Sequence, residues 1–340
     1  MASGLEQLFS AAAKLGASDI HLAVGSPVVF RIDGVLAEQG KKALTAADVE
    51  RAIKGILGAE RFKEFERARE MDAAFAVGAM RFRVNCHFEK EVPGLAARII
   101  PQEIPSVEDI GLTAVATTLC NLSDGLVLFT GPTGSGKSTS LAALLNRINQ
   151  ERSEHIITLE DPVEFLFPQG KGIVRQRQYG SDFLSFPDAL KHVLRQDPDI
   201  VMVGEMRDLE TIAAALTIAE TGHLVFATLH TPNAIQTVDR IVDVFPPHQQ
   251  QQVRIQLSLS LKAIVAQRLL PKVEGGRVAQ REVLVMNPAV GHIIRDNRSQ
   301  ELKSVLQTGR DTGMTTFEVD AKKLYKEGVI SKETFEWARL

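Results

Sequence analysis

The residues best suited to chemistry form the loop Gly131-Pro132-Thr133-Gly134-Ser135-Gly136-Lys137-Ser138, which fits the pattern G-x-x-x-x-G-K-[ST]. The apolar run before it predicts a strand, and residues 139–148 predict a helix directly after it. In such a loop, backbone N–H groups surround phosphate oxygens and the helix N-terminus adds positive potential. Lys137 would reach the β- and γ-phosphates, and the Ser138 hydroxyl would bind Mg²⁺. We therefore expect ATP and Mg²⁺ to bind along Gly131 to Thr139; a glycine-rich turn without a ligand is the alternative.

A carboxylate follows the apolar run 199–203, which predicts a strand ending close to Glu205. Ligands of open α/β sheets bind at the carboxyl ends of the strands, so Glu205 should face the phosphates. P-loop enzymes often carry a magnesium-binding aspartate where this chain has Gly204. That leaves Glu205 as the residue expected to orient or deprotonate the attacking water. An exposed acid without a catalytic role is the alternative.

A second acidic group follows the apolar run 155–160. It comprises Glu160, Asp161 and Glu164, and Pro162 favours a turn that gathers them at the end of the strand. These carboxylates could hold magnesium-bound waters, and Glu160 or Glu164 is the next candidate for a catalytic acid if Glu205 is not one. A loop that is merely acidic is the alternative.

Two histidines, His223 and His230, flank the apolar run 224–229. His230 follows the predicted carboxyl end of this strand and is the better placed to contact the γ-phosphate. His223 lies at the opposite end, where it would serve at a subunit boundary or as a structural hydrogen-bonding residue. A structural role remains the alternative for both.

Three arginines in the first hundred residues could act on phosphate charge. Arg81 and Arg83 are two apart on a predicted strand and share one face, while Phe82 takes the other, and Arg98 lies on the next strand. Arginine suits the charge that develops on a transferring phosphoryl group, and it is often supplied by a neighbouring molecule. A solvated sheet face is the alternative.

The elements that must position these residues divide into two patterns. In residues 1–100, β-prone runs broken at Gly25-Ser26-Pro27 and Asp33-Gly34 predict hairpins, and Thr45 with Asp48 predicts a capping box that opens a helix. Mixed strands and helices of this kind are typical of a small α+β domain.

The remainder of the chain is of the α/β type. Residues 101–112, which contain Pro101 and Pro105, are predicted to be a linker. Within 113–270, short apolar runs alternate with helices, which favours a parallel sheet covered on both faces. Residues 271–340 have helical periodicity and predict a helical C-terminal region. The strand candidates of the core are 126–130, 155–160, 199–203 and 224–229.

Composition excludes several classes of protein. The net charge of −3 over 340 residues lacks the basic excess usual in proteins that neutralise nucleic-acid phosphates. There is no run of eighteen apolar residues to span a membrane, and the N-terminus lacks the features of a secretory signal. Cys86 and Cys120 are too few for a zinc site; free thiols are favoured over a single disulfide.

Five motifs in order carry a family resemblance: SDIHL at 18–22, GPTGSGKST at 131–139, TLEDPVE at 158–164, VGEMRD at 203–208 and TGHLVFATLHT at 221–231. They resemble the secretion and type IV pilus ATPases, most closely the twitching-motility, or retraction, branch. The resemblance implies a PAS-like first domain, a RecA-like P-loop domain with a helical tail, and a homohexameric ring.

By position, the resemblance assigns the two groups of acids and the histidines to named motifs of the family. Glu160, Asp161 and Glu164 belong to the Asp box, Glu205 to the Walker B motif, and His223 and His230 to the His box. The resemblance similarly makes Arg81, Arg83 and Arg98 candidates for arginines that face a neighbour's nucleotide. It implies a cytoplasmic protein at the inner face of the cytoplasmic membrane, acting on an inner-membrane platform protein and indirectly on pilin.

One position departs from the retraction pattern. Members of that branch carry Ala-Ile-Arg-Asn-Leu-Ile-Arg in a C-terminal helix, and here residues 289–295 place Gly291 at the first arginine. Because the chain lacks the N-terminal domain and zinc insertion of assembly members, retraction is the first expectation. An accessory retraction ATPase that needs a partner motor is the second. A RecA-like nucleic-acid translocase and a nucleotide-binding regulator without turnover are less favoured alternatives.

Overall fold

A computed structural model of the chain describes residues 4–32, 34–78, 80–100 and 103–339. The chain folds into two compact units, Met1–Glu103 and Ile104–Leu340. Among the described residues, no helix is both long and apolar enough to cross a membrane.

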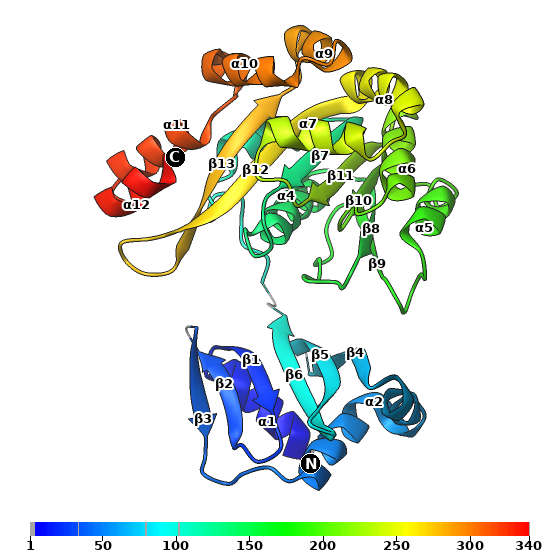
Figure 1. Cartoon of the computed structure of the whole chain (residues 1–340), viewed down its shortest axis with the longest axis vertical. Coiled ribbons are helices and arrows are strands. Elements are labelled where there is room, and N and C mark those ends of the chain that lie inside the picture. The colour runs from blue at the N-terminus through cyan, green and yellow to red at the C-terminus, as the bar shows by residue number, and fades with distance from the viewer. Residues whose placement is uncertain (1–3, 33, 79, 101–102, 340) are drawn as a thin grey trace. The chain divides into compact units, whose positions relative to one another are not determined.

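Unit 1 is an α+β domain built on an antiparallel sheet of six strands, in the order β3-β2-β1-β6-β5-β4 (Figure 1). Its two helices lie against this sheet and close a single core around Phe9 of α1, Ile53 and Phe65 of α2, and Phe82 of β5. The predicted hairpins are present, although Asp33 of one predicted turn lies outside the described residues. The elements are α1 (Gly4–Lys14), β1 (Ala17–Leu22), β2 (Val28–Ile32), β3 (Val35–Gln39), α2 (Ala46–Ala68), β4 (Glu70–Val77), β5 (Met80–Glu89) and β6 (Val92–Ile100).

Helix α2 shows how the local sequence sets the element. Thr45 caps it, with the reciprocal bonds of a capping box between its side chain and Asp48. At Gly58 the backbone leaves the helical region, with φ at 76°, so the element is two helices joined by a kink. The predicted capping box at the start of this helix is thus confirmed. The strand β4, which follows directly, was not predicted because its residues Glu70–Val77 are mostly small or charged.

Unit 2 contains a sheet of seven strands in the order β13-β12-β7-β11-β10-β8-β9. All neighbours are parallel except the pair β12 and β13. The four predicted strands form its centre. The strands are β7 (Gly125–Thr130), β8 (His155–Glu160), β9 (Ile173–Gln178), β10 (Ile200–Val203), β11 (Leu224–Leu229), β12 (Leu261–Pro271) and β13 (Arg277–Val285).

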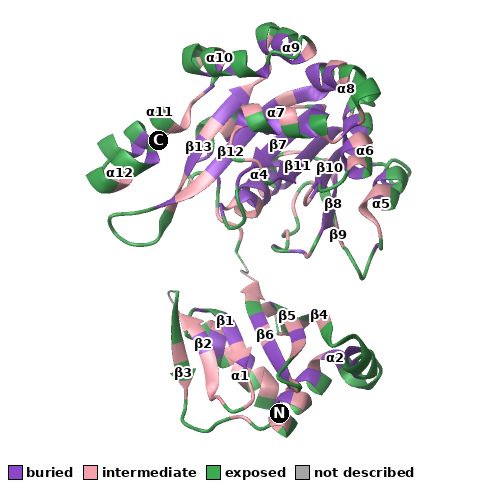
Figure 2. Ribbon diagram, viewed as in Figure 1, coloured by how far each residue is buried: buried purple, intermediate pink, exposed green. Residues whose placement is uncertain are grey.

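Helices cover both faces of this sheet, which explains why its central strands are buried along their whole length (Figure 2). One core holds α3 (Thr113–Leu119) and α4 (Lys137–Glu151) against the sheet. The core on the other face holds α5 (Phe186–Val193), α6 (Leu209–Glu220), α7 (Ala234–Asp243), α8 (Pro247–Ser260), α9 (Pro288–Arg295) and α10 (Leu302–Thr308). A small separate core joins β12 to the last helices, α11 (Phe317–Lys326) and α12 (Lys332–Ala338).

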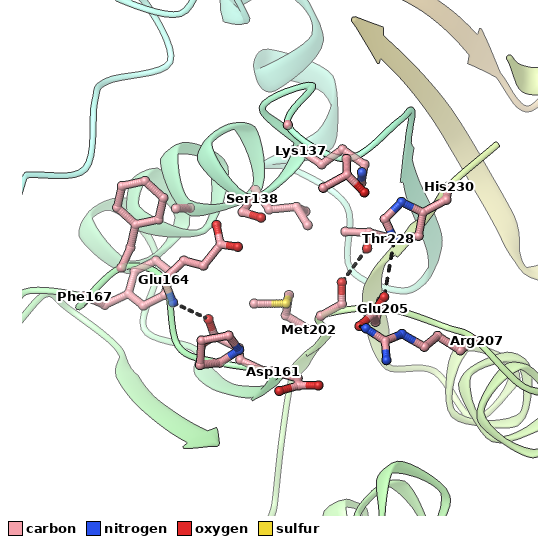
Figure 3. Close-up of a pocket in the computed structure, with 18 residues that line it drawn as sticks. Lys137, Ser138, Asp161, Glu164, Phe167, Met202, Glu205, Arg207, Thr228 and His230 are labelled. Atoms are coloured by element: carbon pink, nitrogen blue, oxygen red, sulfur yellow. Dashed lines mark hydrogen bonds and ion pairs between the residues drawn. The ribbon is translucent and has the colours of Figure 1, made fainter. Parts of the chain in front are cut away.

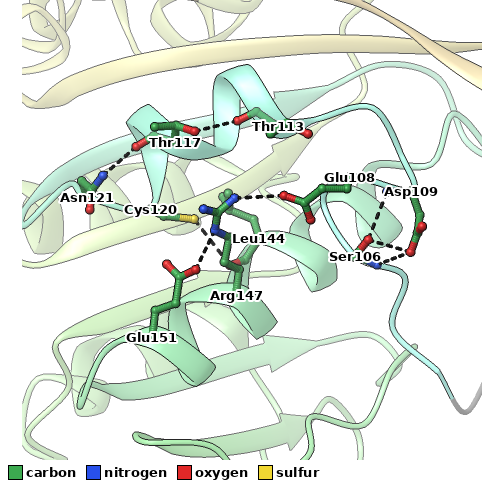
Figure 4. A network of polar contacts seen from close by, with 10 residues as sticks. All are labelled: Ser106, Glu108, Asp109, Thr113, Thr117, Cys120, Asn121, Leu144, Arg147 and Glu151. Carbon is green, nitrogen blue, oxygen red and sulfur yellow. Dashed lines mark hydrogen bonds and ion pairs between the residues drawn. The ribbon is translucent and has the colours of Figure 1, made fainter.

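The predicted linker 101–112 requires a correction. Residues 101 and 102 lie outside the described residues, but the segment from Ile104 onward belongs to unit 2. Val107 and Leu112 are buried in the core under α3, and Glu108 pairs with Arg147 of α4 at 3.4 Å (Figure 4). The proline and polar residues of this segment suggested a linker, whereas its apolar side chains, two of them fully in the core, anchor it to the second unit.

The predicted helical region 271–340 is also wrong in its first part, because β13 occupies residues 277–285 and extends the sheet. Strand β13 pairs antiparallel with β12 from Ala263–Val285 to Pro271–Arg277. The buried Gln280 of this strand donates to Phe317 O and Ala338 O of the C-terminal helices, and such a buried polar residue obscured the strand pattern. The helical prediction holds from α9 onward.

Both cysteines are buried and free, as the sequence favoured. Burial raises the pKa of Cys86 to about 12 and that of Cys120 to about 11. Neither thiol is therefore ionised at neutral pH, so both behave as core residues.

Candidate nucleotide site

The glycine-rich loop connects the end of β7 with the start of α4, as predicted. Its first glycine, Gly131, has φ at 138°, and a Cβ there would lie 2.1 Å from the backbone oxygen of Gln267 on β12. Gly136, just before the helix, has φ at 85°, and its Cβ would lie 2.8 Å from Gln267 Nε2. The loop can rest on β12 only because both positions lack a side chain.

Lys137 is buried at the first turn of α4. Its ammonium donates to the backbone oxygens of Gly131 at 2.8 Å and Pro132 at 3.1 Å. Burial lowers the pKa of Lys137, and the negative charges of Glu164 and Glu205 oppose that shift. The ammonium therefore lies inside the loop, where it can exchange these two carbonyl oxygens for phosphate oxygens.

A cavity of about 260 Å³ opens in front of the loop, and half of the predicted site residues line it (Figure 3). It lies where the carboxyl ends of β8, β10 and β11 meet the start of α4, the expected edge of a parallel sheet. The predicted residues that line it are Thr133, Gly134, Lys137, Ser138, Glu160, Asp161, Glu164, Glu205 and His230. Of the other loop residues, Pro132 is exposed and Ser135 is buried beneath the loop.

Glu205, just after the end of β10, is held between the side chains of an arginine and a histidine. Arg207 donates to its Oε1, and His230 Nε2 lies 3.3 Å from its Oε2 (Figure 3). The hydrogen bond that Arg207 donates to Glu205 raises the pKa of Arg207. The carboxylate is 15% exposed, so it reaches the cavity while its orientation is fixed from both sides. It can act on a water molecule in front of the loop.

Glu160 differs from Glu205 in being buried, at 6% exposure. Its Oε1 accepts hydrogen bonds from Thr158 Oγ1 at 2.6 Å and Gln176 Nε2 at 3.0 Å. Burial raises the pKa of Glu160. Asp161 and Glu164 are exposed, and Glu164 extends into the cavity from the loop after β8 (Figure 3).

The structure does not bring His223 to this cavity. His223 precedes β11, at the end of the strand opposite His230, and its Nδ1 lies 3.0 Å from Thr221 Oγ1. Its backbone oxygen accepts from Gly125 N at 3.0 Å, at the start of β7. Within its own chain, His223 is thus a structural residue at the amino ends of the strands, and direct nucleotide contact is not supported.

The three arginines of unit 1 occupy the positions expected on the sheet. Phe82 is fully buried while Arg81 is half-buried and Arg83 is exposed on the opposite face. Arg83 lies directly across from Arg98 in the pairing of β5 with β6. Arg98 donates to Asp19 of β1 at 2.8 Å, so it has a partner within its own unit.

Comparison with known proteins assigns the family. A family model described as "Type II/IV secretion system protein" matches residues 2–275. The chain belongs to this family. The type IV pilus retraction ATPase PilT of Pseudomonas aeruginosa is 44% identical over 97% of this chain and 96% of its own length. The type IV pilus ATPase PilU of the same bacterium is 38% identical over 96% of this chain and 86% of its own length. A crystal structure of the pilus retraction motor PilT with bound ADP aligns with a TM-score of 0.91 at 45% identity, covering 99% of this chain and 97% of that one.

This secretion family member is an ATPase: both PilT and PilU are ATPases, and the similar structure of PilT holds ADP. Its fold is the α/β fold with an N-terminal domain that the sequence predicted.

Several residues that line the cavity of this secretion ATPase were not predicted from the sequence. Arg207 lies within the VGEMRD motif but has no feature that distinguishes it from a surface arginine. Thr228 donates from its hydroxyl to Gly204 O, which ties β11 to β10 at the base of the cavity. Phe165 and Phe167 line the same cavity from the loop after β8. Their position directly after the acidic motif is the feature of the sequence that indicates a place beside the cavity.

Proposed function

We propose that this ATPase powers the retraction of type IV pili, by driving pilin subunits out of the filament into the inner membrane. The observation that carries the proposal is its 44% identity to PilT over 97% of the chain, and it is supported by a cavity that is lined by residues of the loop and by the acids. The partners would be an inner-membrane platform protein and, indirectly, pilin. The protein would work at the cytoplasmic face of that membrane.

In the proposed reaction the loop N–H groups and Lys137 bind the phosphates, and Glu205 orients and deprotonates the attacking water. His230 and Arg207 hold the Glu205 carboxylate toward that water.

The residues around the cavity also fit a magnesium ion. The Ser138 hydroxyl and the carboxylates of Glu160 and Asp161 line one cavity, and they offer the oxygen atoms that Mg²⁺ prefers. A bound Mg²⁺ would neutralise charge on the β- and γ-phosphates. We assign Ser138 as the direct ligand and the two acids as partners of its bound waters.

We further propose a homohexamer in which Arg81 and Arg83 act on a neighbour's nucleotide. Both lie on a solvated sheet face of unit 1, in a unit separate from the loop. Arg98 is a third candidate, although its pairing with Asp19 favours a role within its own unit.

Mixing two inactive variants tests this arrangement. Glu205→Gln disables a site in its own chain, whereas the double variant Arg81→Ala/Arg83→Ala would disable the neighbour's site. If the arginines act in trans, mixed rings contain some intact sites and ATPase activity returns on mixing. If they act in cis, every site retains one defect and no activity returns. Sedimentation with ATP and magnesium should show hexamers, and an active monomer would contradict the ring.

The test of function is deletion of the gene followed by scoring of surface pili. Retraction predicts excess pili with loss of twitching motility, and bald cells would indicate assembly instead. Complementation with Lys137→Ala should fail to restore motility, because the ammonium supplies charge to the bound phosphates.

A second function, that of an accessory retraction ATPase needing a partner motor, is favoured by two observations. The chain is 38% identical to PilU as well, and Gly291 stands where the retraction pattern has an arginine. However, a Cβ at Gly291 would lie 3.8 Å from Arg295 Nη1, so a guanidinium already occupies the space beside it. Restoration of full twitching by this chain in a strain without its own motors would exclude the accessory function.

A further inference from the structure

Gln267 of β12 lies directly behind the glycine-rich loop and contacts it at two points. Its backbone oxygen packs against Gly131, and its side-chain Nε2 donates to the backbone oxygen of Ser135 at 2.6 Å. The side chain is 1% exposed. Both ends of the loop therefore rest on one buried residue.

The surrounding donors fix the orientation of this amide. Its Oε1 accepts from Ser140 Oγ at 2.8 Å and from Arg281 Nε at 3.1 Å. The reversed amide would place its NH₂ against these two donors and its oxygen against the carbonyl of Ser135. Only the observed orientation satisfies all three partners, Ser140, Arg281 and Ser135, so Nε2 must face the loop.

Arg281 is the residue that holds the amide from the far side. It lies across from Gln267 in the pairing of β13 with β12 and is buried at 5% exposure. Its other guanidinium nitrogens donate to Gly111 O at 3.1 Å and Ser140 Oγ at 3.3 Å. Burial lowers the pKa of this arginine to about 10, so it remains charged at neutral pH. A charged group thus anchors the amide with well-defined geometry.

The bond to Ser135 determines where the next N–H points. In a trans peptide, the carbonyl of one residue and the N–H of the next point in opposite directions. Because Gln267 draws the Ser135 carbonyl toward β12, the N–H of Gly136 must point away from β12. That is the direction required of a loop whose N–H groups surround a phosphate.

We propose that Gln267 is a positioning residue for the phosphates of ATP, which acts by orienting the Ser135–Gly136 peptide, and that Arg281 acts through Gln267. The inference rests on the use of this loop for ATP. It predicts that the amide matters for nucleotide affinity although it touches no nucleotide.

The experiment compares two buried glutamines on the paired strands. Gln280 of β13 is fully buried; it accepts from Arg268 Nε at 2.7 Å and donates to Phe317 O at 2.6 Å. It has a similar set of bonds but faces the C-terminal helices instead of the loop. Gln267→Met should weaken binding of a fluorescent ATP analogue about tenfold or more, because the Ser135–Gly136 peptide loses the bond that orients its N–H toward the phosphate, and raise KM with little change in kcat. Gln280→Met should lower Tm similarly but leave the affinity within about twofold.

Two further variants complete the test. Gln267→Glu keeps the acceptor for Arg281 and removes only the donor to Ser135, so it should weaken binding even if Gln267→Met does not fold. Arg281→Met should weaken ATP binding in the wild-type background and add nothing in the Gln267→Met background.

Unchanged affinity in both Gln267 variants, or equal losses in the two glutamine variants, would overturn the inference, and additive losses would overturn the action of Arg281 through Gln267. If the unmodified protein bound no ATP, the proposed function itself would fail instead.

Discussion

Replacement of Glu205 by glutamine is the most direct perturbation of the proposed chemistry. Glutamine has the same shape and retains a carbonyl oxygen, but it cannot take a proton from water. The residue contacts two side chains, Arg207 and His230, which are 69% and 49% exposed. Contacts to such exposed groups contribute little to folding, so the free energy of unfolding should change by less than about 1 kcal/mol. Any large loss of turnover therefore reports on the reaction, not on the fold.

The expected loss follows from the role of a general base. Such a group typically accelerates a reaction by about 10² to 10⁴, which corresponds to a barrier difference of about 2.7 to 5.4 kcal/mol. ATP affinity should stay within about twofold, because the phosphates are bound by the loop and Lys137. A large loss of turnover with an unchanged ATP affinity would therefore show that Glu205 acts in catalysis and not in binding.

The assay is phosphate release at saturating ATP and magnesium, with ATP affinity measured in parallel by titration. Glu164→Gln is the matched control, since Glu164 lines the same cavity but is exposed and extends from a different loop. Turnover of Glu205→Gln within about threefold of the unmodified protein would refute the assignment. If Glu164→Gln instead lost turnover, Glu164 would be the base.

Three further predictions concern stability. Gly131→Ala should lower the free energy of unfolding about 2 kcal/mol more than Gly134→Ala, because its Cβ would meet a backbone oxygen at 2.1 Å whereas Gly134, also at positive φ, faces open space; equal losses in denaturant melts would contradict this. Burial raises the pKa of Glu160 above its ordinary 4.5, so the folded state binds the proton more tightly and unfolding free energy should fall as pH rises above 4.5. Glu160→Gln should remove that slope in a pH series of melts, and an unchanged slope would assign it elsewhere. Gly291→Ala should raise the unfolding free energy by up to about 1 kcal/mol, because its Cβ would make only ordinary contacts, the nearest at 3.6 Å from Ser258 O; a loss of stability would show that α9 has no room there.

The central strands and the site were predictable from sequence because each had a local signal. The strands β7, β8, β10 and β11 are continuous apolar runs, and the loop has a fixed spacing of glycines and Lys137. Since parallel strands end at one edge of the sheet, residues that follow those runs had to meet there. His230 met Glu205 in this way, and His223 could be placed at the other edge by the same reasoning.

The strands that pack behind the glycine-rich loop, β12 and β13, could not be predicted from the sequence. Strands β12 and β13 carry buried polar side chains, such as Gln267 and Arg281, whose partners come from distant parts of the chain. A buried polar residue in a strand breaks the apolar pattern, so the segment resembles a helix or loop until its hydrogen bonds are seen. The predicted boundary at 101–112 was wrong for a related reason, since only scattered apolar residues, Ile104, Val107, Ile110 and Leu112, mark that segment as part of the core.

The structure also gives a physical reason why the acid follows β10 at Glu205 and does not stand at Gly204. Gly204 N donates to Leu159 O at 2.7 Å, and a Cβ at Gly204 would lie 3.1 Å from that same oxygen and 3.3 Å from the Cα of Glu160. The end of β8 is thus packed against this position, and an aspartate there would displace it together with Glu160. The acid can be carried one residue later, at Glu205, where the chain has left the strand and the side chain reaches the cavity. The close pairing of β8 and β10 thus leaves little room for an aspartate at Gly204, and the ligands that we propose for Mg²⁺ lie instead on α4 and at the end of β8.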